Sequence, residues 1–232
     1  MEQAADRLRS VVQRTEQAAH RAGRNPQEIV LVAVTKTVPL DHVLPFIQAG
    51  IRRVGENRVQ EALTKYSTPL PLGGEGLGEG FIRPEFHLIG PLQSNKAKKA
   101  IAFFDVIQSL DRWDLAEDLN RHAQAIGKVQ DCLIEVKVSE EPSKSGLLPE
   151  AFPDFLSRLS SLPNLRVRGL MGIPPLAATG DAARPYFQCL QRLFQDSCLE
   201  VLSMGMSSDF EVAIEEGSTM VRIGSALFGP RP

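Results

Sequence analysis

The chain has 232 residues, of which 43% are hydrophobic, and its formal net charge at pH 7 is −2. This length and composition allow one domain, residues 1–232, with a full core, and the small net charge argues against nucleic-acid binding, which needs a basic surface. Residues 1–7 lack the apolar core of a signal peptide, and no apolar run has the length of a membrane span. We therefore expect a cytoplasmic protein with neither nucleic-acid nor membrane partners.

Neither the cysteines nor the histidines indicate a metal or redox site. Cys132, Cys189 and Cys198 are odd in number and have no close CxxC spacing, so we interpret them as buried free thiols. The histidines are scattered over the predicted elements rather than clustered. We expect no bound metal.

The first elements are a helix and a buried strand. Residues 2–22 carry apolar side chains at helical spacing and end at Gly23, which predicts an amphipathic N-terminal helix. Residues 29–34 form a continuous, largely β-branched apolar run, typical of a parallel strand covered on both faces. Lys36 follows it. Most such lysines simply reach solvent, but the carboxyl ends of barrel strands carry ligand-binding groups, and a partly desolvated lysine can form an imine. Lys36 is therefore a Schiff-base candidate.

The alternation of helix and strand continues. Residues 39–50 predict a helix in which Pro45 fits poorly and indicates a kink or a later start. Residues 53–57 predict a short strand with Asn57 at its far end, and 59–66 predict a helix. Asn57 is either a turn residue or a polar contact to a ligand, and its position alone leaves both open.

Residues 67–85 interrupt this pattern. They are rich in glycine and proline and have no periodicity, which predicts a flexible, low-complexity loop insertion. Since the loop joins a helix to the next strand, it should lie on the amino-terminal face of a barrel, away from the ligand. We expect a deletion of residues 68–83 to leave ligand binding intact.

Further strands alternate with helices, and they are predicted over residues 86–90, 104–110, 132–138 and 165–171. His87, in the first of them, is equally well interpreted as a hydrogen-bonded core histidine and as a site residue. Asp111 is the predicted cap of the helix that contains Trp113.

Residues 199–225 read as strand, Gly/Ser turn, short helix, strand and second Gly/Ser turn. Ser207 and Ser208 lie where a helix would begin, so free N–H groups and a helix dipole would face the first turn. Gly224 and Ser225 form the second amide-rich turn. Paired turns after the last two strands bind phosphate in many (β/α)8 barrels. The sequence thus predicts an α/β fold, a single (β/α)8 TIM-type barrel with an extra N-terminal helix, and a ligand that carries a phosphate.

Three segments together resemble the pyridoxal phosphate homeostasis protein family, whose barrel is similar to the N-terminal domain of bacterial alanine racemase. They are residues 31–36 with 55–57, residues 87–96, and residues 202–209 with 221–225. The resemblance covers nearly the whole chain in matching order. The 67–85 insertion departs from the family pattern, as does Phe86, where a tryptophan is common.

The resemblance implies pyridoxal 5′-phosphate (PLP) as the cofactor and Lys36 as its Schiff-base lysine. It implies that the phosphate binds to Ser207, Ser208, Gly224 and Ser225. Arg222 matches the residue that faces the pyridine nitrogen, and the positions near the ring are Asn57, His87 and Met204. No residue is assigned a catalytic role.

A guanidinium beside the pyridine nitrogen disfavours ring protonation, so the ring would be a poor electron sink. Racemisation also needs a base on the opposite face of the substrate, and no second domain is expected after Pro232 to supply it. We expect a PLP-binding protein of vitamin B6 homeostasis without turnover, a monomer rather than an oligomer, with apo PLP-enzymes as candidate partners. A small PLP-dependent amino-acid racemase with a base from a loop, and a barrel that binds a sugar phosphate, remain the alternatives.

Overall fold

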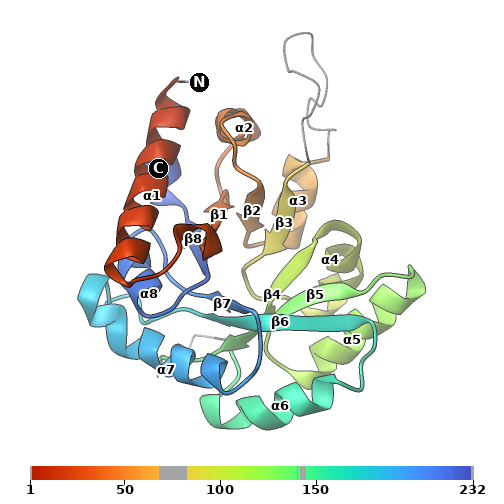
Figure 1. Ribbon diagram of the computed structural model, residues 1–232. Coiled ribbons are helices and arrows are strands. Elements are labelled where there is room, and N and C mark those ends of the chain that lie inside the picture. The colour runs from red at the N-terminus through yellow and green to blue at the C-terminus, as the bar shows by residue number, and fades with distance from the viewer. Residues whose placement is uncertain (1, 68–82, 140, 142–144, 231–232) are drawn as a thin grey trace.

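The fold is a closed parallel barrel (Figure 1). The computed structural model describes residues 2–67, 83–139, 141 and 145–230. Within these ranges eight strands pair in chain order, and β8 returns to pair with β1. The strands are β1 (Val30–Val34), β2 (Arg53–Glu56), β3 (Glu85–Leu88), β4 (Val106–Leu110), β5 (Gln130–Val136), β6 (Leu165–Gly172), β7 (Val201–Ser203) and β8 (Met220–Ile223). The predicted TIM-type (β/α)8 fold is confirmed.

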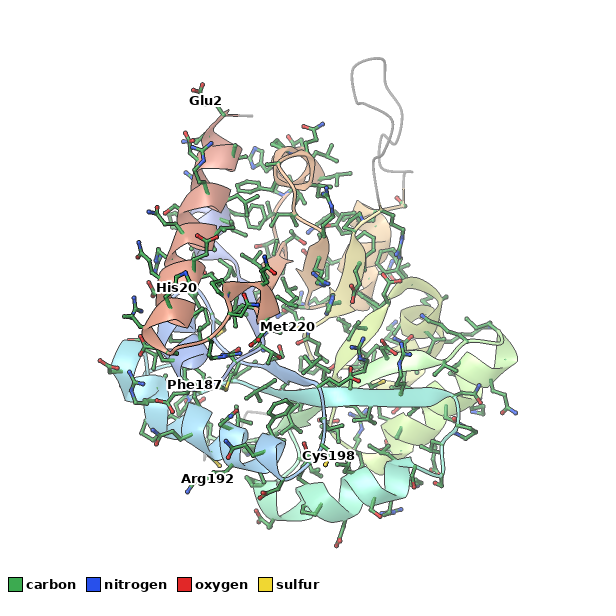
Figure 2. The ribbon with its side chains drawn as sticks, in the orientation of Figure 1. Glu2, His20, Phe187, Arg192, Cys198 and Met220 are labelled. Carbon is green, nitrogen blue, oxygen red and sulfur yellow. The ribbon has the colours of Figure 1, made fainter. Side chains whose placement is uncertain are left out.

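Helices surround the barrel in the described part of the chain (Figure 1). They are α1 (Glu2–Arg21), α2 (Leu40–Gln48), α3 (Val59–Lys65), α4 (Ala97–Phe103), α5 (Trp113–Ala125), α6 (Phe152–Leu159), α7 (Arg184–Gln195), α8 (Phe210–Glu215) and α9 (Ser225–Phe228). Each long helix is amphipathic. In α7, for example, Phe187 is buried against the barrel and Arg192 is exposed on the opposite side (Figure 2).

The extra N-terminal helix α1, whose two ends are marked by Glu2 and His20 in Figure 2, packs against α8, α9 and α2. Its buried face contains Val11, Ala18 and Ala19. Arg14 of α1 forms two hydrogen bonds to the carboxylate of Glu211 in α8, at 2.9 and 3.0 Å. The helix therefore supports the α8 and α9 side of the barrel, next to the turns after β7 and β8.

Three local expectations need correction. The helix with Pro45 does not start late: it begins at Leu40 and continues through Pro45. Asp111 does not cap α5; Arg112 occupies the N-cap position, and the Asp111 carboxylate accepts a hydrogen bond from Arg112 Nη1 at 2.9 Å. Of the free cysteines only Cys132 is buried, because it alone lies in a strand.

Most of the loop predicted at residues 67–85 lies outside the described residues, and Glu85 is already the first residue of β3.

The barrel interior changes from apolar to polar along the strands. One inward-facing layer is apolar and consists of Val32, Val106, Leu133, Met171 and Met220. The next inward position after Met220 in β8 is Arg222. The next inward position after Leu133 in β5 is Glu135. The interior thus becomes polar where the strands end.

Candidate functional site

A pocket of about 500 Å³ opens at the carboxyl ends of the strands. Small-molecule sites in proteins usually enclose about 300–1,000 Å³, so the pocket has the size of a cofactor site. Most of the predicted site residues line it, namely Lys36, Asn57, Ser207, Ser208, Arg222, Gly224 and Ser225. The structure therefore brings together residues that are far apart in the sequence.

Lys36 lies in the turn after β1 and is half-buried. The Thr35 N–H donates to Gly55 O at 3.0 Å, and the Val38 N–H donates to Thr35 O at 2.9 Å, which closes the turn. Thr37 has a φ of 63°, in the left-handed region that non-glycine residues rarely adopt. Backbone strain of this kind gathers at ligand sites, where surrounding contacts hold it in place.

The turns after β7 and β8 are joined by one hydroxyl group. Ser207 Oγ accepts the Gly224 N–H at 3.1 Å and the Ala226 N–H at 3.2 Å. Two backbone N–H groups thus converge on a single oxygen, an arrangement that suits an oxygen of a phosphate group.

The helix near these turns begins later than predicted. Helix α8 starts at Phe210 with Asp209 in the N-cap position, so Ser207 and Ser208 lie in the turn before it. Asp209 Oδ1 accepts the Met206 N–H at 2.6 Å, and Asp209 Oδ2 accepts the Ser208 hydroxyl at 3.3 Å. The Asp209 side chain therefore fixes the shape of the turn, and burial raises the pKa of its carboxyl group.

Arg222 forms one wall of the pocket and is 3% exposed. Its Nη1 donates to Ser203 O at 2.7 Å and to Ser203 Oγ at 2.6 Å, and its Nη2 donates to Gly172 O at 2.9 Å. Burial lowers the pKa of the guanidinium to about 10, against the opposing effect of Glu135 and Asp209, so the group stays charged at neutral pH. None of the hydrogen bonds among the described residues uses Nε–H, which leaves this donor for a ligand.

Glu135, which is not among the predicted site residues, also lines the pocket. It is 7% exposed; its Oε1 accepts the Ser145 hydroxyl at 3.2 Å, and its Oε2 has no hydrogen-bond partner among the described residues. Burial, followed by the charge of Asp111, raises the pKa of Glu135 to about 7. The available signal was a carboxylate that directly follows the apolar run of residues 132–134 in a predicted strand.

The structure does not bring His87 and Met204 into the lining of the pocket. Met204 is fully buried between barrel and helices, because its neighbour Ser203 faces inward. His87 lies in the barrel interior, where its Nδ1 is 2.8 Å from Gln108 Nε2. Its Nε2 lies 3.1 Å from Glu85 Oε1, although the angles are not those of a hydrogen bond.

Gln108 links His87 to the site. Ser203 Oγ donates to Gln108 Oε1 at 2.7 Å, and the same hydroxyl accepts from Arg222. Among the described residues, His87 is therefore linked to the pocket through Gln108 and Ser203. Across the described ranges, no group of three or more His, Cys, Asp or Glu side chains is placed to hold a metal ion. None of the helices described is both long enough and apolar enough to cross a membrane.

Comparisons with known proteins identify the family of the chain. The family model "Alanine racemase, N-terminal domain" matches residues 6–232. The pyridoxal phosphate homeostasis protein of Aquifex aeolicus is 43% identical over 234 residues, covering 98% of each chain. The protein of the same name from Escherichia coli K12 is 40% identical over 238 residues, covering 100% of this chain and 98% of its own.

A solved structure is also similar. PipY of Synechococcus elongatus, with PLP bound, superimposes with a TM-score of 0.80 at 36% sequence identity. The match covers 97% of this chain and 100% of PipY. The likeness therefore extends over the whole barrel.

Proposed function

Because the chain belongs to the pyridoxal phosphate homeostasis proteins, a family that shares the barrel of the alanine racemase N-terminal domain, we propose that it binds PLP in the pocket at the carboxyl ends of its strands. One observation carries this proposal. Lys36 after β1 and the amide-rich turns after β7 and β8 line the same pocket, although they are far apart in the sequence. A cavity that is lined both by an amine and by turns rich in backbone N–H groups suits a ligand with an aldehyde and a phosphate group.

The phosphate binds at the two turns in this proposal. The amides of Gly224 and Ala226 already converge on one oxygen, that of Ser207. Ser208 and Ser225 add hydroxyl groups at the edge of the pocket. Backbone N–H groups of this kind hold a phosphate without needing a lysine or arginine side chain.

When bound, PLP supplies an aldehyde that condenses with an amine, releasing water, and a ring that can withdraw electrons. Lys36 provides that amine and forms the Schiff base. Arg222 lines the pocket, and its fixed positive charge disfavours a second positive charge on the pyridine nitrogen. Asn57 contacts the ligand from the end of β2. His87 acts only through Gln108 and Ser203, and Met204 through packing behind β7.

We propose PLP homeostasis without catalytic turnover as the biological role. Arg222 supports this, because it keeps the ring from becoming a strong electron sink. The names of the relatives support it as well. Location in the cytoplasm, delivery of PLP to apo PLP-enzymes and a monomeric state belong to the same proposal.

A small amino-acid racemase is the second candidate, and Glu135 is the observation that favours it. A two-base racemase needs a proton carrier facing its lysine, and Glu135 comes from β5 while Lys36 follows β1, four strands away around the eight-stranded barrel. Exchange of the α-proton of amino acids in deuterated water separates the candidates. Rapid exchange with loss of stereochemistry would favour the racemase, whereas a binding protein leaves the amino acids unchanged.

Titration of the purified protein with PLP tests binding itself. We expect the absorbance of a protein-bound imine to appear and to saturate at one PLP per chain. Pyridoxine 5′-phosphate, which has an alcohol in place of the aldehyde, should compete without producing this absorbance. A protein that binds phosphate esters but shows no imine with PLP would instead be a sugar-phosphate binder.

A further inference from the structure

A cluster of charged side chains lies behind the turn that carries Lys36. It consists of Glu56 at the end of β2 with Glu61 and Lys65 of α3, and we refer to it as the β2–α3 cluster. Lys65 Nζ lies 2.8 Å from Glu56 Oε1 and 3.3 Å from Glu61 Oε1. The Lys65 side chain is 9% exposed and that of Glu56 is fully buried. Neither residue belongs to the lining of the pocket.

The cluster binds the residue before Lys36 through two groups. Thr35 Oγ1 donates to Glu56 Oε1 at 2.6 Å, and Lys65 Nζ donates to the backbone oxygen of Thr35 at 2.7 Å. Tyr66 Oη lies 3.0 Å from Thr35 Oγ1 on the same side. Both the side chain and the carbonyl group of Thr35 are thereby fixed.

The cluster also binds the residue after Lys36. The Thr37 N–H donates to Glu61 Oε1 at 2.5 Å. Thr37 is the residue with the left-handed φ of 63°, a strained conformation that a non-glycine residue keeps only where surrounding contacts hold it. The Glu61 carboxylate supplies such a contact, and the ion pair to Lys65, four residues on in the same helix, holds this carboxylate in turn.

Stability alone explains this arrangement poorly. Burial of Glu56 raises the pKa of its carboxyl group, against the hydrogen bonds from Lys65 and Thr35. Glu56 Oε2 has no hydrogen-bond partner among the described residues. A buried ion pair is often no more stabilising than apolar side chains of the same volume, and an unpaired oxygen adds to its cost. What the cluster does achieve is to hold both neighbours of Lys36.

We propose that Glu56, Glu61 and Lys65 are positioning residues for Lys36: they hold the backbone from Thr35 to Thr37 in the strained conformation that directs the lysine into the pocket. This inference rests on the proposed function, because it concerns the amine that condenses with PLP. Covalent attachment to Lys36 and binding of the phosphate group should then respond separately to substitutions. The phosphate turns after β7 and β8 lie outside the cluster, so a change in the cluster alters the covalent step and leaves phosphate affinity intact.

Two variants and one control test this. Glu61→Ala removes the contact to Thr37 and keeps the Glu56–Lys65 pair, so the fold should persist, while Lys65→Met removes the contacts to Thr35 O and to both carboxylates. Lys128→Met is the matched control. Lys128 is another half-buried lysine, and its Nζ donates to Ile101 O at 2.8 Å and to Phe104 O at 2.7 Å, outside the pocket lining.

Each protein is measured with two probes. With PLP, the measured quantity is the rate at which a borohydride-reducible adduct forms on Lys36. With pyridoxine 5′-phosphate, it is the dissociation constant, which reports the phosphate turns without a covalent step. Thermal unfolding of the same samples shows which variants remain folded.

We expect adduct formation about tenfold slower or more in both variants, since small misplacements of a reacting group cost this much, while the affinity for pyridoxine 5′-phosphate and the rate in Lys128→Met stay at wild-type values. Adduct formation at the wild-type rate in folded Glu61→Ala would overturn the positioning role, as would a parallel loss of pyridoxine 5′-phosphate affinity. A wild-type protein that binds pyridoxine 5′-phosphate but forms no adduct would overturn the Lys36 assignment itself, and this inference with it.

Discussion

Ser207 Oγ, in the turn after β7, accepts the backbone N–H of Gly224, in the turn after β8, at 3.1 Å. The Ala226 N–H donates to the same oxygen at 3.2 Å. This hydroxyl joins the two turns at the edge of the pocket and marks the point where their amides converge. The proposed phosphate site is thus formed mainly by backbone N–H groups, and the position of the Ser207 hydroxyl shows where they converge.

Replacing Ser207 and Ser208 together by glutamate should release PLP even though Lys36 is intact. The two carboxylates would repel the phosphate group of PLP. The loss of one hydrogen bond to a charged group, worth about 1.5–3 kcal/mol, already predicts a drop in affinity of at least tenfold. Equilibrium dialysis with PLP measures the effect. The same double change at Ser160 and Ser161, an exposed pair after α6, is the control. Tight PLP binding by the first variant would locate the phosphate elsewhere.

Arg222→Met should destabilise the barrel as well as weaken the site. The substitution leaves the buried carbonyl groups of Ser203 and Gly172 without their donors, at a cost of about 3 kcal/mol in the free energy of unfolding. Urea denaturation measures this cost. The control is Arg166→Met, which removes a surface ion pair to Asp131 and should change stability far less. Equal losses in the two variants would contradict the assigned role of Arg222.

Glu135 should make stability depend on pH. Its pKa is raised from 4.5 to about 7 in the folded protein, so between these values the folded state binds more protons than the unfolded state. The contribution of Glu135 to the free energy of unfolding is therefore fully present below about pH 4.5. It falls, by at most about 3 kcal/mol, as the pH rises through 7. In Glu135→Gln this component of the pH profile should be absent. Identical pH profiles of unfolding for the two proteins would show that Glu135 ionises normally.

Gln108→Leu should cost about 2 kcal/mol of stability, because it leaves the buried Ser203 hydroxyl without its acceptor and His87 Nδ1 without its partner. Arg222 keeps its bonds to two backbone carbonyl groups, so we expect little change in PLP affinity. In the double variant with His87→Leu, part of the loss should be recovered, because the orphaned imidazole is gone. Urea denaturation of both variants tests this. A double variant less stable than the sum of the single changes would contradict the linkage.

The barrel could be predicted because its signals are local. Each strand is a short apolar run next to a polar turn, and each long helix repeats its apolar residues at helical spacing. The pocket residues Lys36 and Ser207 could be found for the same reason, since each lies in a turn that follows a predicted strand. The errors at Asp111 and Ser208 are shifts of one residue in the N-cap, at element boundaries where sequence patterns discriminate least.

The remaining features depend on contacts between segments. Glu56, Lys65 and Thr35 come from three separate elements, and nothing in their spacing shows that the side chains meet. Met204 was expected near the ring from the family resemblance alone, and the structure buries it in the core behind β7, since side chains alternate along a strand and its neighbour Ser203 faces inward. Glu135 was missed because its burial depends on how β5 packs within the barrel.

The most direct test of the central claim is the site of covalent PLP attachment. The protein is loaded with PLP, reduced with borohydride and digested, and the modified peptide is identified by mass spectrometry. We predict a single phosphopyridoxyl group on Lys36; Lys36→Ala should carry no such group and should keep part of its PLP affinity through the phosphate turns. An equal yield of adduct in Lys36→Ala, or attachment in the native protein to another lysine of the pocket such as Lys137, would contradict it.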